Sequence, residues 1–217
     1  EPQTLDPHRA TGVPEGNNLR DLFELLVMEA PNGELIPAAA ESWTISEDGL
    51  VYTLRIRSDG RWSNGDPVTA EDFVYSLRRA VDPATLSTYS SILYPIKNAQ
   101  AINRGELLPE QLGVAAPDSL TLSIQLEAPT PYFLGLLNHS MSYAVHRPSV
   151  EQHAERFARA GNLVGNGAYV LTDWVVQSHV ELARNQNYRD DASTTINRVL
   201  YYAIENAEAV LKRYRAD

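Results

Sequence analysis

The stretch RWSNGDPVTAEDFVYSLRRAVDP, residues Arg61 to Pro83, decides the local fold, because the turn before its helix and both helix ends can be read from it. Ser63 to Pro67 is a cluster of turn formers, since Asn and Gly tolerate positive φ and Pro presets φ without a backbone donor. Thr69 can cap the helix that follows, and Asp72, three residues later, is the acidic half of a capping box. The pair Asp82-Pro83 ends the helix, because the residue before a proline avoids the α region. The stretch therefore predicts a tight turn followed by a capped helix.

The apolar residues of this helix are spaced to fall on one face. Phe73, Leu77, Ala80 and Val81 recur at helical spacing, which is typical of a helix that buries one side. Val68, just before the cap, can pack against Phe73 as a hydrophobic staple. We therefore expect the helix to cover a core.

The segment that precedes the turn alternates between apolar and polar residues. Apolar residues stand at 52, 54 and 56 and polar ones at 53, 55 and 57, after a turn at 47–49. The same period of two runs from Leu120 to Leu126, and it is the pattern of a half-buried strand. We expect a hairpin from 169–176 and 180–183 around Gln177-Ser178, then a strand over 199–204 and a helix from Asn206.

Two further helices are expected from apolar spacing and caps. The stripe Leu19, Leu22, Phe23, Leu26 and Val27 predicts a short helix with Asn17 or Asn18 as its cap. A second capping box at Ser149 and Gln152 predicts a helix that continues to Ala160.

Composition narrows the class of protein. The 217 residues carry a formal net charge of -10, which argues against a nucleic-acid partner, because phosphate binding needs a basic face. The chain has no cysteine, which excludes thiol catalysis and cysteine metal sites and slightly favours a location outside the cytoplasm. No apolar run approaches the ~20 residues that cross a bilayer, and if the protein is exported, its signal peptide has been removed.

The sequence carries no motif of a known catalytic or cofactor site. It has no G-x-S-x-G elbow, no H-E-x-x-H pair, no P-loop and no complete dinucleotide fingerprint. Gly165-Asn166-Gly167 comes nearest to that fingerprint, but a β-rich run follows it where a helix is needed, so we interpret it as a turn. His139, His146 and His153 are seven residues apart, yet Pro148 prevents one helix from carrying all three. We predict no catalytic residue, no metal site and no cofactor.

Several separated motifs together resemble one family. They are WSNGDPVTAEDFVYS at 62–76, TLDPH at 4–8, TGVPEGNNLRDLFE at 11–24, PYF at 131–133, NGAY at 166–169 and LKRYRA at 211–216. In their order along the chain they resemble the peptide-binding family of extracellular solute-binding proteins, family 5, and within it the oligopeptide-binding receptors of ABC importers. The resemblance runs essentially from end to end.

The resemblance implies an α/β fold. It is a periplasmic-binding-protein type II-like lobe, a mixed sheet with helices, plus a smaller α+β accessory domain. Residues 1–23 and 147–217 are expected to form part of the lobe, and residues 24–146 the accessory domain. The second lobe is expected to be absent, so that the chain is similar to the N-terminal part of a larger receptor.

The resemblance also implies a function and a site. The function is that of a non-catalytic, monomeric protein, periplasmic or extracellular and membrane-associated, that passes oligopeptides to the permease of an importer. Thr11, Gly12 and Val13 match an extended segment that pairs with the backbone of the peptide, and Tyr89 matches a tyrosine that lines the cleft. Backbone pairing uses groups that every peptide has, so affinity does not depend on side chains. Family members often carry an acidic residue where this chain has Thr11, which leaves the side-chain preference open.

Alternatives remain open at this point. The same family also includes receptors for nickel, haem or oligosaccharides. A peptide hydrolase that uses paired carboxylates is a different class, although no pair of carboxylates in the sequence can be assigned acid and base roles. The segment from Thr11 to Val13 is also compatible with an ordinary loop, since Pro and Gly commonly mark loops.

Overall fold

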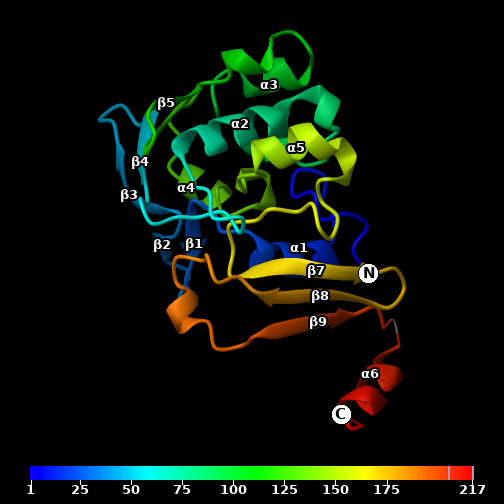
Figure 1. Cartoon of the computed structure of the whole chain (residues 1–217). Coiled ribbons are helices and arrows are strands. Elements are labelled where there is room, and N and C mark those ends of the chain that lie inside the picture. Colours follow the sequence, from blue (N-terminus) through cyan, green and yellow to red (C-terminus); the bar gives the residue numbers. More distant parts are fainter. Residues whose placement is uncertain (205, 217) are drawn as a thin grey trace.

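A computed structural model describes residues 1–204 and 206–216 (Figure 1). The α-helices are α1 (Val13–Leu22), α2 (Ala70–Val81), α3 (Ala99–Asn103), α4 (Phe133–Leu136), α5 (Arg147–His153) and α6 (Ala207–Tyr214). The strands are β1 (Val27–Glu29), β2 (Leu35–Pro37), β3 (Ala40–Ile45), β4 (Val51–Ile56), β5 (Val114–Asp118), β6 (Thr121–Gln125), β7 (Tyr169–Val175), β8 (His179–Arg184) and β9 (Arg198–Tyr202). Short 3₁₀ helices lie between them, at Pro83–Thr85, Ser90–Leu93, Pro109–Gln111, Ser140–Ser142, Ala154–Arg156 and Asp191–Ser193.

Helix α2 has the limits that the sequence predicts. The Thr69 N–H and hydroxyl both donate to Asp72 Oδ2, at 2.7 Å and 2.9 Å. The hydroxyl thus bonds to the carboxylate, and the Asp72 N–H donates to the Thr69 carbonyl instead, at 3.2 Å. At the other end Asp82 is extended, and its Oδ1 accepts the Ala84 N–H of the following 3₁₀ helix at 2.8 Å.

Helix α2 covers an antiparallel sheet of order β3-β4-β6-β5. Tyr52, Leu54 and Ile56 of β4 are buried, as the alternation predicts, and Leu54 pairs with Leu122 of β6. Trp62 and Phe73 are fully buried in the same core. This first core takes its residues from positions 26–144.

A second core lies on the antiparallel sheet β7-β8-β9 and includes helix α1 (Figure 1). The predicted hairpin is confirmed, and Gln177 at its turn takes a left-handed φ of 61°. The buried residues of this core come from both ends of the chain and include Leu5, Leu19, Leu22, Phe23, Tyr143, Val145, Phe157, Leu171 and Leu182. Every strand pair within 1–204 and 206–216 is antiparallel. None of the helices within these residues is long and apolar enough to span a membrane.

Two predicted helices have different limits. Helix α1 starts at Val13, with Pro14 in its first turn where a missing N–H costs nothing, and ends at Leu22. Phe23, Leu26 and Val27 of the predicted stripe therefore lie outside the helix, and Val27 belongs to β1. The prediction that Asn17 or Asn18 caps the helix is wrong, because both lie inside it. Helix α5 likewise starts earlier, at Arg147, so the prediction that Ser149 caps it is wrong. It ends at His153, where Ala154 turns to a φ of 48°.

The NGAY motif forms a junction rather than a nucleotide site. Asn166 Oδ1 accepts the Glu24 N–H at 2.9 Å, and its Nδ2 donates to the Glu24 carbonyl at 3.3 Å. A Cβ on Gly167 would lie 2.5 Å from the Asp21 carbonyl oxygen, so the two backbones approach too closely for any larger residue.

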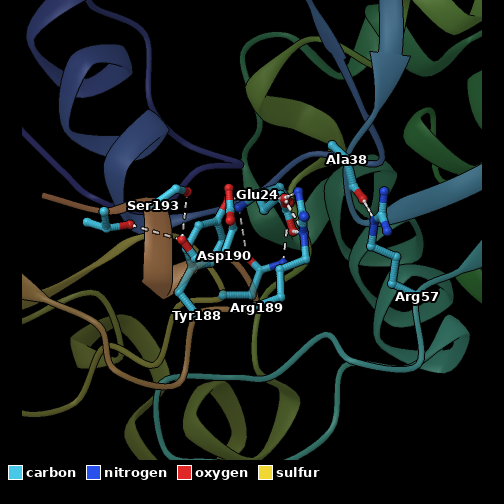
Figure 2. Close-up of polar contacts among 9 residues, drawn as sticks. Glu24, Ala38, Arg57, Tyr188, Arg189, Asp190 and Ser193 are labelled. Atoms are coloured by element: carbon cyan, nitrogen blue, oxygen red, sulfur yellow. Dashed lines mark hydrogen bonds and ion pairs between the residues drawn. The ribbon is translucent and has the colours of Figure 1, made fainter.

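A buried ion pair completes this junction. Figure 2 shows Arg189 and Tyr188 directed at the carboxylate of Glu24. Arg189 Nε lies 2.9 Å from Glu24 Oε1, and Tyr188 Oη donates to the same oxygen at 3.2 Å. Nearby, Arg57 Nε donates to the Ala38 carbonyl at 2.7 Å (Figure 2). The junction lies at the end of α1, where the chain passes from the second core to the first.

Candidate ligand-binding site

The segment that the sequence predicts to contact a ligand lies on the surface. Thr11, Gly12 and Val13 are all exposed, and Val13 is 77% exposed. Gly12 is extended, with φ of -112° and ψ of 163°, and Val13 is already the first residue of α1. The extended part of the predicted segment therefore ends at Gly12.

The backbone of this segment has free donors. Within 1–204 and 206–216, the N–H groups of Thr11 and Gly12 donate to no other group. The Gly12 carbonyl accepts the Gly16 N–H at 3.1 Å, as the first bond of the helix. We call residues Thr11 and Gly12 the free edge, because an extended chain beside them could accept a hydrogen bond from one of these N–H groups.

Tyr89 lies next to the free edge. Its hydroxyl donates to the Thr11 carbonyl at 3.4 Å, across 78 residues of sequence. Its ring meets the His139 ring edge to face, with centroids 5.5 Å apart and an interplanar angle of 75°. The fold thus brings together Thr11 and Tyr89, which the sequence singles out separately.

His139, for which the sequence suggests only the metal-ligand interpretation, lies beside Tyr89 in the candidate site. Its Nδ1 accepts the Met141 N–H at 3.3 Å, so in the neutral ring the proton sits on Nε2. Burial lowers the pKa of His139 and favours that neutral form. No sequence signal pairs it with Tyr89, because the contact depends on how two distant 3₁₀ segments pack.

His146, the next of the three evenly spaced histidines, has different neighbours from His139. His146 packs edge to face against Trp62, and its Nε2 lies 3.4 Å from Asp66. Within the part of the chain that the structure describes, no group of three or more His, Asp or Glu side chains is placed to hold a metal ion.

A buried cluster supports the turn that leads to the free edge. Arg79 of α2 reaches both oxygens of Asp6, at 2.9 Å and 2.6 Å, and its Nη1 lies 2.8 Å from His8 Nδ1. His8 Nε2 lies 3.1 Å from the Tyr143 carbonyl. Because a carbonyl only accepts, Nε2 carries the proton and Nδ1 accepts from Arg79.

The charges of this cluster are set by burial and by Arg79. Burial lowers the pKa of His8 to about 4, and the positive charge of Arg79 adds to this effect. Burial alone would raise the pKa of Asp6, but the hydrogen bonds and charge of Arg79 outweigh it, and the pKa is lowered. Near neutral pH the cluster therefore holds an ionised Asp6, a charged Arg79 and a neutral His8.

The start of α1 also borders a hollow. It has a volume of about 520 Å³ and lies between α1 and the β8-β9 edge of the second sheet. Val13, Pro14 and Asn17 line one side of it, and Tyr201 and Tyr202 line the other. Val13 is thus at the rim of a concave surface.

Comparison with known proteins gives a consistent result. Residues 34–216 match the model of the bacterial extracellular solute-binding proteins, family 5 Middle. The chain is 44% identical over its whole length to the periplasmic murein peptide-binding protein MppA of Escherichia coli. It spans about 40% of the length of that relative.

Solved structures agree with the sequence comparison. The unliganded open form of MppA superposes with a TM-score of 0.95 at 43% identity, over all of this chain and 42% of MppA. OppA of Haemophilus influenzae, in complex with RPPGFSPFR, superposes with a TM-score of 0.95 at 42% identity, over all of this chain and 42% of OppA. The predicted α/β fold, with its solute-binding lobe, is confirmed by these superpositions.

Proposed function

Because the chain belongs to the bacterial extracellular solute-binding proteins of family 5, we propose that it forms part of a receptor that captures oligopeptides for an ABC importer. The observation that carries this proposal is the free edge. Thr11 and Gly12 present unpaired N–H groups at the surface, and the Tyr89 hydroxyl is bonded to the Thr11 carbonyl between them. An extended peptide backbone has the carbonyl groups that these donors need.

Pairing through the main chain accounts for a broad choice of ligand. Every peptide offers the same alternation of N–H and C=O groups, so an edge that binds them gains affinity without reading side chains. Thr11 carries a neutral hydroxyl and adds no fixed charge beside the ligand. Selection by charge, if present, has to come from other residues.

Tyr89 and His139 are the side chains that line the proposed site. Tyr89 combines an apolar ring with a hydroxyl, a combination that suits contact with both faces of a peptide. The Nε2–H of His139 is oriented by the Met141 N–H on the other ring nitrogen, which leaves it available to an acceptor group of the ligand. Val13, at the rim of the hollow, adds exposed apolar surface.

The proposed receptor has two units in this chain. Residues 1–23 and 147–217 belong to the lobe and residues 24–146 to the accessory domain. Two separate hydrophobic cores support this division, since one draws on positions 26–144 and the other on both ends of the chain. Leu25, Tyr143 and Val145 pack in the second core although they lie just inside the accessory range, so the units share residues at their border.

The receptor acts by enclosure and not by chemistry. It is a monomer that is periplasmic, or extracellular and membrane-associated. It closes on its peptide by a hinge motion and delivers the peptide to a permease. Its relatives are named as binding proteins, which supports a role without catalysis.

Calorimetric titration tests the proposal. The gene product at its full encoded length is titrated with tri-, tetra- and penta-alanine. The expected result is saturable binding of at least one peptide without turnover. Binding of nickel, haem or an oligosaccharide in place of every peptide would assign the protein to another branch of the family, and cleavage of the peptides would support the hydrolase alternative.

A further inference from the structure

The segment before the free edge is held by a helix that belongs to the other core. Arg79 lies on α2, which packs in the first core, while Leu5 is fully buried in the second. The fork of Arg79 binds both oxygens of Asp6, and the side chains are 16% and 7% exposed. The two cores are thus joined by a bidentate ion pair that water scarcely reaches.

Asp6, held by this ion pair, also organises the turn that follows it. The Asp6 carbonyl accepts the N–H groups of Arg9 and Ala10, at 3.1 Å and 3.0 Å, and closes a tight turn. The Asp6 carboxylate also accepts the His8 N–H at 3.1 Å. Thr11 follows this turn directly, so a shift of Asp6 moves the free edge with it.

The free edge is therefore held at two points. Arg79 holds the turn before it through Asp6 and His8, and Tyr89 holds the Thr11 carbonyl. Both come from the 24–146 part of the chain, whereas the edge itself precedes α1. The position of the free edge therefore depends, through Arg79 and through Tyr89, on how the 24–146 part of the chain lies against the N-terminal segment.

We propose that Arg79 is a positioning residue for ligand binding, which holds the free edge in the conformation that pairs with a peptide. This inference rests on the proposed function and adds a residue that does not itself contact the ligand. When only a fraction of molecules holds the competent conformation, the apparent affinity falls by that fraction. Loss of the Arg79 fork lowers that fraction and leaves the pairing groups of Thr11 and Gly12 unchanged.

The chain contains a matched control for this role. Arg189 forms a comparable buried pair with Glu24, and the side chains are 19% and 6% exposed. That pair lies beyond the far end of α1, whose 10 residues span roughly 15 Å from Val13. The two arginines are similarly buried, and each is paired with a carboxylate. They differ because Asp6 lies in the turn just before the free edge, whereas Glu24 does not.

The experiment compares Arg79→Lys with Arg189→Lys in the full-length gene product. Lysine keeps the charge and loses the planar fork, so both variants should unfold at lower urea concentration. Binding of the alanine peptide that the unsubstituted protein prefers is measured without urea, where circular dichroism shows each variant folded. We expect Arg79→Lys to weaken binding roughly 2- to 30-fold and Arg189→Lys to leave it within about 2-fold of the unsubstituted protein.

The outcomes separate the two proposals. Equal affinity of Arg79→Lys and the unsubstituted protein, or equal weakening in both variants, would overturn the positioning role. If Arg79→Lys does not fold, Asp6→Glu, which keeps the charge and displaces the carboxylate by one methylene, replaces it with the same expected loss and the same criterion. Failure of the unsubstituted protein to bind any of the peptides rejects the proposed function itself, and the positioning role with it.

Discussion

The hydroxyl of Tyr89 lies 3.4 Å from the carbonyl oxygen of Thr11. This contact links the 24–146 part of the chain, which contains the first core, to the segment that leads into α1 of the second core. The bond occupies one lone pair of that carbonyl. The tyrosine ring also supports His139. One side chain therefore orients two groups of the proposed site.

Removal of this hydroxyl tests its role. Tyr89→Phe should lower peptide affinity roughly 2- to 10-fold, because a single neutral hydrogen bond contributes about 0.5–1.5 kcal/mol. The unfolding free energy should fall by about 1 kcal/mol or less, since Tyr89 is 38% exposed and water can replace its partner. Tyr132→Phe is the control, because Tyr132 is 68% exposed and lies at the start of α4. Equal affinities of the two variants would contradict the role of Tyr89.

Substitution of Gly12 tests the space beneath the free edge. A Cβ at Gly12 would lie 2.3 Å from Glu15 Oε2, and the other oxygen of this buried carboxylate accepts the Gln3 N–H at 2.8 Å. Gly12→Ala should therefore displace Glu15, destabilise the protein by about 1–3 kcal/mol and weaken peptide binding. Urea unfolding and calorimetry measure the two effects.

Gly16 is the matched control for that substitution. It lies in α1, and a Cβ there would meet nothing within 4 Å. Gly16→Ala should stabilise the protein by about 0.5–1 kcal/mol through helix propensity and leave binding unchanged. A Gly12→Ala variant that behaves like Gly16→Ala would show that the edge tolerates a side chain.

The buried imidazole of His8 should make stability depend on pH. Its folded pKa of about 4 lies below the ordinary histidine value of 6.5, so between these values the unfolded chain binds more protons. The stability that His8 contributes is complete above pH 6.5 and is lost as the pH falls toward 4, by up to about 3 kcal/mol. Urea unfolding between pH 4 and 8 measures the slope, and His8→Gln should reduce it. An unchanged slope in that variant would show that His8 is not the group responsible.

The close approach at the NGAY motif should tolerate no side chain. A Cβ on Gly167 would lie 2.6 Å from Leu22 C and Phe23 N, both of which are backbone atoms that cannot rotate away. Gly167→Ala should cost about 3 kcal/mol or more in unfolding free energy or prevent folding. Gly135→Ala is the control, since a Cβ there would have nothing within 4 Å. Equal urea midpoints for both variants would refute the close packing.

Local patterns account for the elements that were predicted correctly. The helix start at Thr69, the alternation around Leu54 and the hairpin at Gln177 each depend on neighbouring residues, and each lies where expected. The start of α1 was missed because Gly12 and Pro14 suggest irregular chain, although proline is well suited to a first helical turn. The early end of α1 lies beside a long-range contact, in which Asn166 bonds the Glu24 backbone from 142 residues away.

The site could be predicted only in part, for a similar reason. Thr11, Gly12, Val13 and Tyr89 were indicated by resemblance to a family, and their individual roles remain proposals. The ring contact of Tyr89 with His139 and the ion pair of Asp6 with Arg79 each connect residues that are far apart in the sequence. Neither has a local pattern, because each depends on how the two cores pack together.

Hydrogen–deuterium exchange at the backbone amides of Thr11 and Gly12 reports directly on whether the free edge pairs with a peptide. Exchange is followed in the full-length gene product, with and without a saturating alanine peptide. Rapid exchange is expected at both amides in the free protein, with clear protection of at least one of them when peptide is bound. Bound peptide with unchanged exchange at both amides would contradict pairing at the free edge.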